Sequence, residues 1–330
     1  MLAVSLSAAV APRAICVPAF AQDAWPNRPV EVICPFSAGG PTDVFIRIFC
    51  AFASERTGQN FLVKNILGAS GTIGTAALAK AAPDGYTIGL YNAVTHASST
   101  MIIPDGVDVA APAPYDSVKD FAAIGTLYLQ SNVLLTRRDL PVSSVEELVA
   151  LAKVNPKPYT AAHGGIATTP HISLVLFEQM TGITFTSVGY KGGTGEAVRD
   201  IVGGHADLMF DNIGPAVTNI RAGTMKGLAV TSRKRNRQLP ELPALDELLP
   251  GYEMTTWGGL CGPRGLPQAV VDKLSALIKE ALEGEVGRKY TQMGAEPVFM
   301  NPVETLAFRN SDAKRIHDSL VKAGFKVRPE

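Results

Sequence analysis

The 330-residue sequence lacks the short motifs by which many enzymes are identified. No glycine loop is followed by Lys-Ser or Lys-Thr, so a Walker phosphate loop is absent. There is no G-x-S-x-G nucleophile elbow, and the five histidines show neither H-E-x-x-H nor Cys/His zinc spacing. These absences give no support for a catalytic residue, a metal or a cofactor. A catalytic pair that only the fold assembles stays open.

Excess charge and plentiful cysteine are also missing. Lys+Arg and Asp+Glu number 30 each, which excludes the basic footprint of a nucleic-acid-binding protein. The chain has four cysteines, of which Cys16 lies in the first segment and leaves an odd set of three. We interpret Cys34, Cys50 and Cys261 as small buried hydrophobic residues, and their redox state stays open.

Long apolar runs are absent except at the beginning of the chain. Residues 1–21, "MLAVSLSAAVAPRAICVPAFA", are small and apolar and end in the A-x-A pattern of a signal-peptide cleavage site. No Lys or Arg precedes the apolar stretch, which a true start codon further upstream would explain. No other stretch reaches the ~20 apolar residues of a membrane span. We therefore expect a protein exported to the periplasm, with residues 1–21 removed.

The rest of the chain alternates strand-like and helix-like segments. "VEVICPF", "NFLVKN" and "YTIGLYN" predict strands that are separated by helices, and the alternation restarts at "NVLLTRR". Repeated β-α-β units predict an α/β fold with mainly parallel sheets and flanking helices. The tail is mostly helical. We expect one lobe over 22–128, a second over 129–252, and a C-terminal segment, 253–330, that returns to the first.

Two loops of similar composition follow strands in the two predicted lobes. Gly39-Gly40-Pro41-Thr42 has a counterpart in Gly164-Gly165 through Thr169-Pro170, and "NILGASGTIG" adds a third glycine turn before a helix. Each loop places backbone N–H groups and a helix N-terminus at the carboxyl end of a strand, where open α/β sheets bind ligands. The alternative is that the glycines and prolines only end strands and start helices.

Four blocks of sequence resemble one family. "WPNRPVEVICPFSAGGPTD", "NILGASGTIGTAALAKAAPDGYTIGL", "VGYKGGTGEAVRDIVGGHADLMFDN" and "GLAVTSRKRNRQLPELPALDELLPGYE" are similar, in this order, to the Bug-type receptors, the solute-binding proteins of tripartite tricarboxylate transporters. The resemblance runs from about Trp25 to the C-terminus. It implies a two-lobe clamshell of the type II periplasmic binding protein kind, which closes on a small carboxylated solute without catalysis.

The resemblance also implies which residues contact the solute. Such receptors hold carboxylates by main-chain amides, helix N-termini and bridging waters. In the first lobe the implied residues are Phe36, Ser37, Gly39, Gly40, Thr42, Asn92 and Ala93. In the second they are His163, Gly164, Gly165, Thr168, Thr169, His171 and Asp211.

Some polar side chains have a structural alternative. Asp43 falls at N3 of its helix and is better interpreted as a cap than as a ligand contact. Asp211 would suit an ammonium or hydroxyl group of the solute, or it only bonds a loop. His171 is equally interpreted as a histidine that is satisfied within the protein.

The second-lobe loop departs from the family pattern. It reads "AAHGGIATTPH", where relatives read closer to S-A-G-N-G-S-x-x-H, so Ile166 and Ala167 replace a polar side chain and a glycine. This predicts a more apolar pocket. The expected ligand is a mono- or dicarboxylate, with aromatic acids and amino acids among the options. The expected partners are membrane transporter subunits. A sensor subunit of a signalling system and a two-lobe enzyme acting on organic acids, an isomerase or hydrolase, are the alternatives. We expect a monomer.

Overall fold

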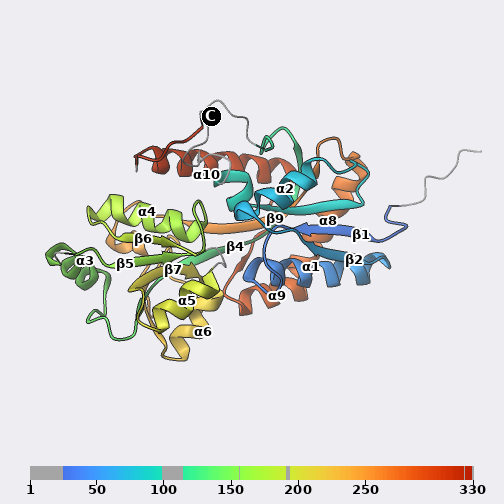
Figure 1. Cartoon of the computed structure of the whole chain (residues 1–330). Helices are drawn as coiled ribbons and strands as arrows, with labels where there is room; N and C mark the ends of the chain where they lie inside the picture. The colour runs from blue at the N-terminus through green and yellow to red at the C-terminus, as the bar shows by residue number, and fades with distance from the viewer. Residues whose placement is uncertain (1–24, 99–113, 156, 191–193, 323, 329–330) are drawn as a thin grey trace, which may run out of the picture.

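The computed structural model describes residues 25–98, 114–155, 157–190, 194–322 and 324–328 (Figure 1). The predicted signal peptide, 1–21, lies outside these residues. Within them, no helix is long and apolar enough to cross a membrane.

The first half of the chain forms a three-stranded parallel unit with helices on it. Its elements are β1 (Val30–Cys34), α1 (Pro41–Thr57), β2 (Phe61–Asn65), η1 (Ala69–Gly71), α2 (Thr72–Ala79), β3 (Thr87–Asn92) and the π-helical turn η2 (Val94–Ser98). The strands lie in the order β2-β1-β3, and both pairings are parallel. The β-α-β pattern of the sequence predicted this unit, because a helix crossover joins parallel neighbours.

The second half repeats this arrangement after a long strand. Its elements are β4 (Phe121–Arg137), α3 (Val145–Val154), β5 (Thr160–His163), α4 (Thr169–Thr181), β6 (Thr186–Gly189), α5 (Thr194–Val202), β7 (Leu208–Asn212), α6 (Ile213–Arg221), β8 (Met225–Val230) and α7 (Leu245–Leu248). Strands β7, β5 and β6 are parallel neighbours, whereas β7 and β8 each pair with β4 in the antiparallel direction.

Two long strands connect the halves. The beginning of β4 pairs with β9 (Thr255–Pro263), which also pairs with β3, and the end of β4 pairs with β7 and β8 (Figure 1). The α/β fold class is confirmed, with parallel pairs inside each half and antiparallel pairs along the connection. Because β4 and β9 run between the halves without a break, the boundaries at 128/129 and 252/253 stay predictions.

Strand β9 was not predicted, and its glycines explain why. Glycine has low strand propensity, so "WGGLCG" does not resemble a buried strand. A Cβ atom added at Gly259 would lie 2.2 Å from the carbonyl oxygen of Gly125 on β4. Only a residue without a side chain allows the two backbones to approach so closely. The expectation of a mostly helical tail is confirmed for the part of the chain after β9, which contains α8, α9 and α10.

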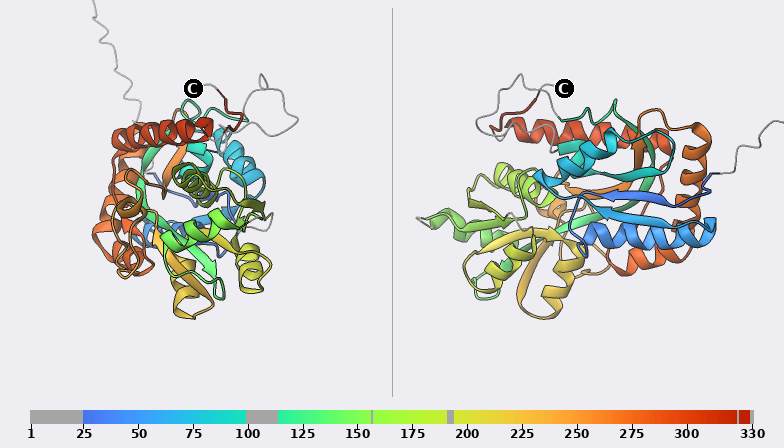
Figure 2. Two further views of the ribbon diagram at one scale, coloured as in Figure 1. Left: turned by 90° about the vertical axis from the view of Figure 1, so that its left-hand side faces the viewer. Right: turned by 45° about the vertical axis from the view of Figure 1, so that its right-hand side comes forward.

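The remaining C-terminal elements pack against both halves. They are α8 (Gln268–Glu283), α9 (Glu285–Gln292), the short strand β10 (Glu296–Pro297) and α10 (Pro302–Lys322). Helices α8 and α9 pack with α1 in the first half. Helix α10 starts on η2 and β4 and extends to α4 in the second half, where Gln179 Nε2 donates to the carbonyl of Ser319 (2.5 Å; Figures 1 and 2).

The core has three groups of buried apolar residues, one of which extends across both halves. Cys34, Cys50 and Cys261 are buried within the core, as predicted, and none of them pairs with another cysteine of the described residues. Burial raises the pKa of the Cys34 thiol to about 11 and that of Cys50 to about 12. These thiols are thus protonated and unreactive near neutral pH.

Candidate functional site

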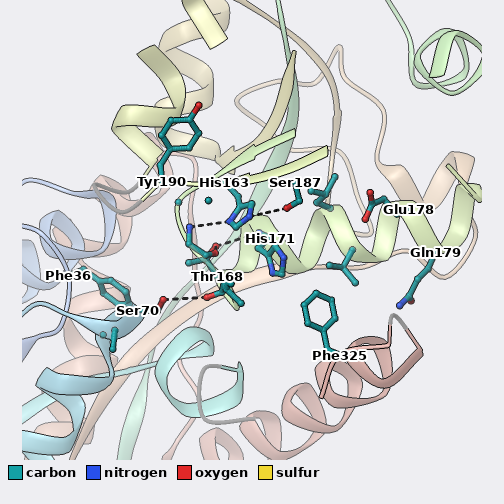
Figure 3. Close-up of a pocket in the computed structure, with 18 of the residues that line it drawn as sticks. Phe36, Ser70, His163, Thr168, His171, Glu178, Gln179, Ser187, Tyr190 and Phe325 are labelled. Carbon is teal, nitrogen blue, oxygen red and sulfur yellow. Dashed lines mark hydrogen bonds between the residues drawn. The ribbon is translucent and has the colours of Figure 1, made fainter. Parts of the chain in front are cut away.

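A cavity of about 1690 Å³ opens between loops of the two halves (Figure 3). The first half contributes the residues after β1 and the glycine loop before α2, which are Pro35, Phe36, Ser37 and Leu67 to Gly71. The second half contributes the loop after β5, the end of β6 and helix α4, which include His163 to Ile166, Thr168, His171, Ser187, Gly189 and Tyr190. The cavity thus lies beyond the carboxyl ends of parallel strands, where α/β sheets bind ligands.

The two halves contact each other at this cavity through two serines. Ser70 Oγ donates to the carbonyl oxygen of Ile166 (3.3 Å), and Ser98 Oγ donates to that of Ala167 (2.7 Å). Both donors belong to the first half and both acceptors to the loop after β5. Ala69, Ser70 and Ala167 have positive φ angles, 47°, 52° and 65°. A left-handed backbone conformation is unfavourable for residues other than glycine, and residues in this conformation are often found at functional sites.

Helix N-termini lie next to this contact. Helix α2 begins at Gly71, a cavity-lining residue, and no side chain caps it. Helix α4 begins at Thr168, whose hydroxyl accepts from the N–H of His171 (3.5 Å). The amide groups of a helix N-terminus and the helix dipole favour an anion, worth roughly 0.3–1 kcal/mol at an exposed site.

Two neutral histidines form one wall of the cavity. His163 Nδ1 accepts from the N–H of Gly165 (3.2 Å), which leaves the proton on Nε2 to donate to Ser187 Oγ (3.1 Å). His171 Nδ1 accepts from the N–H of Ala167 (3.3 Å), so its proton is also on Nε2. Burial lowers the pKa of His163, and burial together with His163 lowers that of His171 to about 3. His171 therefore offers the cavity an uncharged N–H donor at neutral pH.

Charged side chains are few around the cavity. Among the described residues that line it, only Glu178 and Lys322 are ionised types. Glu178 Oε1 accepts from the N–H of Phe185 (2.7 Å), and burial raises the pKa of its carboxyl group. In the parts of the chain that the structure describes, no group of three His, Cys, Asp or Glu side chains is placed to hold a metal ion.

Half of the sequence-predicted site residues come together in this cavity. Those that line it are Phe36, Ser37, His163, Gly164, Gly165, Thr168 and His171. Those that do not are Gly39, Gly40, Thr42, Asn92, Ala93, Thr169 and Asp211. The glycine loop after β5 thus lines the cavity, whereas Gly39, Gly40 and Thr42 of the first glycine loop do not, and only Phe36 and Ser37 before them reach it.

The residues outside the lining make internal contacts. The Thr169 hydroxyl bonds that of Thr256 on β9. Asn92 Oδ1 accepts from the N–H of Thr95 (3.0 Å), while its buried Nδ2 has no partner within the described parts of the chain. Asp43 accepts from the N–H of Gly39 (2.9 Å). The interpretation of Asp43 as a backbone cap is therefore confirmed.

Asp211 is buried at the end of β7, with 1% of its surface exposed. Its Oδ1 accepts from the N–H of Asn212 (2.8 Å), and its Oδ2 has no hydrogen-bond partner among the residues that the structure describes. Burial raises the pKa of this carboxyl group to about 7. A carboxylate in this position is costly to ionise, which distinguishes it from an ordinary surface aspartate.

Sequence reasoning missed several lining residues. Ser70 belongs to the third glycine turn, which had been noted but not assigned to the site. Ser187 and Tyr190 follow from the placement of β6 beside β5, and Phe325 arrives from the far end of the chain. No local sequence signal marks Phe325, because only the packing of α10 on α4 brings it to the cavity.

Comparisons with known proteins show the family of the chain and support its fold. The family model described as "Tripartite tricarboxylate transporter family receptor" matches residues 45–324. Protein BugT of Bordetella pertussis is 31% identical over 308 residues, which is 93% of this chain and 92% of BugT.

Three solved structures are also similar. R. palustris Rpa4515 with adipate has a TM-score of 0.85 at 32% identity, covering 93% of this chain and 100% of that one. Periplasmic binding protein BugD has a TM-score of 0.80 at 33% identity, and the match covers 92% of this chain and 99% of BugD. MatC from Rhodopseudomonas palustris with bound malate has a TM-score of 0.79 at 30% identity, and the match covers 90% of this chain and 100% of MatC. The chain belongs to the receptor family of the tripartite tricarboxylate transporters.

Proposed function

We propose that this protein captures a small organic acid in the cavity between its halves and delivers it to membrane subunits of a transporter. It acts as a monomer in the periplasm and binds without converting its ligand. The supporting observation is the pair of serine–carbonyl hydrogen bonds between the two halves, Ser70–Ile166 in the cavity lining and Ser98–Ala167 beside it. A cavity whose walls belong to two halves can close around a solute and exclude water.

The chemistry of the cavity supports a carboxylate as the group that is recognised. Its donors near the contact are uncharged, namely backbone amides, the Ser37 hydroxyl and the Nε2–H of His171. Several such donors can hold an anion without the desolvation cost of a buried lysine or arginine. The adipate of Rpa4515 and the malate of MatC are both carboxylates.

The periplasmic location rests on relatives and on the first residues. BugD is named as a periplasmic binding protein. Residues 1–21 have the A-x-A pattern of a signal peptide, which we propose is removed on export.

Ligand discovery tests the proposal. The protein is purified after export, and native mass spectrometry together with calorimetry of a carboxylate panel identifies what it binds. We expect binding of at least one carboxylate and no product after prolonged incubation. Turnover of the bound acid would favour the enzyme alternative, and absence of binding to any carboxylate would refute the proposal.

A histidine variant tests the uncharged donor. His171→Phe keeps a ring of similar size between His163 and Phe325 but removes the Nε2–H, so we expect about 10-fold weaker carboxylate binding, the loss of roughly one hydrogen bond to a charged group. His205→Phe, at an exposed histidine outside the cavity, is the control. Equal affinities of both variants and the unmodified protein would exclude a role for His171.

A further inference from the structure

We call the place where the serine–carbonyl hydrogen bonds join the two halves the loop contact. The cavity extends from this loop contact along helix α4. In Figure 3, Phe36, Ser70 and Tyr190 lie near one end, and Glu178 and Gln179 lie near the other. We define the α4 trough as Leu174, Val175, Glu178, Ile183 and Phe325, all of which line the cavity. A volume of about 1690 Å³ exceeds the roughly 300–1,000 Å³ of most small-molecule sites. A short hydroxy acid would fill only part of it.

Four of the five trough side chains are apolar. The Phe325 ring stands edge-on to the His171 imidazole, with ring centroids 5.6 Å apart and an interplanar angle of 89°. Near the loop contact, Leu67 and Ile166 are 53% and 57% exposed and face the cavity from opposite halves. Leu174, Val175 and Ile183 are already 2%, 5% and 6% exposed, so an apolar ligand body would mainly cover Leu67, Ile166 and the half-buried Phe325 and gain about 25 cal/mol per Å² that it removes from water.

The charges at the end of the trough disfavour a second carboxylate. Glu178 is half-buried on α4, whereas Lys322 is exposed at the end of α10 and remains hydrated. A ligand carboxylate at this end would lie beside the Glu178 carboxyl group in a partly dry environment, where repulsion is screened less than in water. Lys322 offsets this repulsion weakly, because its flexible ammonium group stays in solvent.

We infer that the ligand is a monocarboxylate whose charged end lies at the loop contact and whose aliphatic or aromatic body fills the α4 trough. This inference rests on the proposed function and narrows it. It sets this chain apart from Rpa4515, whose structure contains the dicarboxylate adipate.

Calorimetry with three acids on the full chain tests the inference. The acids are 4-phenylbutanoate, adipate and malate, which differ in apolar length and in the second carboxylate. We expect 4-phenylbutanoate to bind at least about 10-fold more tightly than the other two, since burying a phenyl group is worth roughly 1.5–3 kcal/mol.

Two variants assign the preference to the trough. Phe325→Ala should lower the affinity for 4-phenylbutanoate about 5- to 10-fold and change the affinity for adipate less than about twofold. Glu178→Gln keeps an oxygen that accepts from the N–H of Phe185. It should raise the affinity for adipate by about threefold or more and leave the affinity for 4-phenylbutanoate unchanged. Val303→Ala, at a 78% exposed position on α10, is the control.

The outcomes separate this inference from the proposed function. Binding of adipate or malate as tight as that of 4-phenylbutanoate would overturn the inference and leave carboxylate capture standing. So would an equal effect of Phe325→Ala on all three acids. Failure of every carboxylate to bind would overturn the proposed function and the inference together.

Discussion

At the scale of single residues, burial decides the charge state of the groups in and near the cavity. His163 and His171 are kept neutral by desolvation, so one nitrogen of each ring accepts from a loop amide and the other donates. The raised pKa of Asp211 comes from the same cause acting on an acid. The carboxylate recognition that we propose would therefore use uncharged donors.

Asp211 makes the stability of the protein depend on pH. Burial raises the pKa of its carboxyl group from 3.8 to about 7, so the folded protein holds a proton that the unfolded chain releases between these values. This contribution to the free energy of unfolding is fully present below pH ~4 and is lost as pH rises through about 7. In Asp211→Asn the loss is absent. We therefore expect that, between pH 5 and pH 8, the free energy of unfolding of the unmodified protein falls by about 1–3 kcal/mol relative to that of the variant.

Urea unfolding at pH 5 and pH 8 measures this difference. Because all other titrating groups are common to both proteins, their contributions cancel. Parallel pH dependences of the two proteins would show that Asp211 ionises normally.

At the scale of elements, interactions between neighbouring residues determine where helices begin and end. Asn301 Oδ1 accepts from the N–H of Glu304, and Glu304 Oε2 accepts from the N–H of Asn301, as the Asn-Pro-x-Glu pattern predicts for the start of α10. Helix α1 ends at Gly58, which has a φ of 70°. These interactions join residues that are close in sequence, so they can be predicted without the fold.

The end of α1 tests the importance of the left-handed cap. Gly58→Ala places a side chain at positive φ, which costs an L-residue about 1 kcal/mol, although nothing crowds the new methyl group. Gly195→Ala is the matched change, because Gly195 is in α5 with equally free space and no positive φ. Chemical denaturation should show destabilisation by about 1 kcal/mol for the first and stabilisation by up to about 0.5 kcal/mol for the second. Similar effects of both substitutions would contradict the role of Gly58.

At the scale of the whole molecule, serine–carbonyl hydrogen bonds join the two halves beside the cavity. Ser98 does not line the cavity, yet its hydroxyl donates to Ala167 across the contact. A hydrogen bond that forms only when the halves meet stabilises the closed state relative to any open one.

Ser98→Ala should weaken this closed state. We expect affinity for the ligand to fall about 3- to 10-fold, mainly through faster dissociation, because a net hydrogen bond is worth about 0.5–1.5 kcal/mol. Ser54→Ala is the control, since the Ser54 hydroxyl bonds only within the first half. Surface plasmon resonance gives both rate constants. An unchanged dissociation rate in Ser98→Ala, or an equal change in both variants, would exclude coupling through this bond.

The sequence by itself determined the β-α-β units, the helix caps and the two glycine loops, because each depends on residues within a few positions of one another. Tertiary structure alone decided which loop residues face the cavity. It also placed the glycine-rich β9 beside β4 and brought Phe325 to His171, 154 positions earlier in the chain. Such contacts form only when whole strands and helices pack together. The elements that bring two backbones close, or direct a side chain into the cavity, are far apart in the sequence.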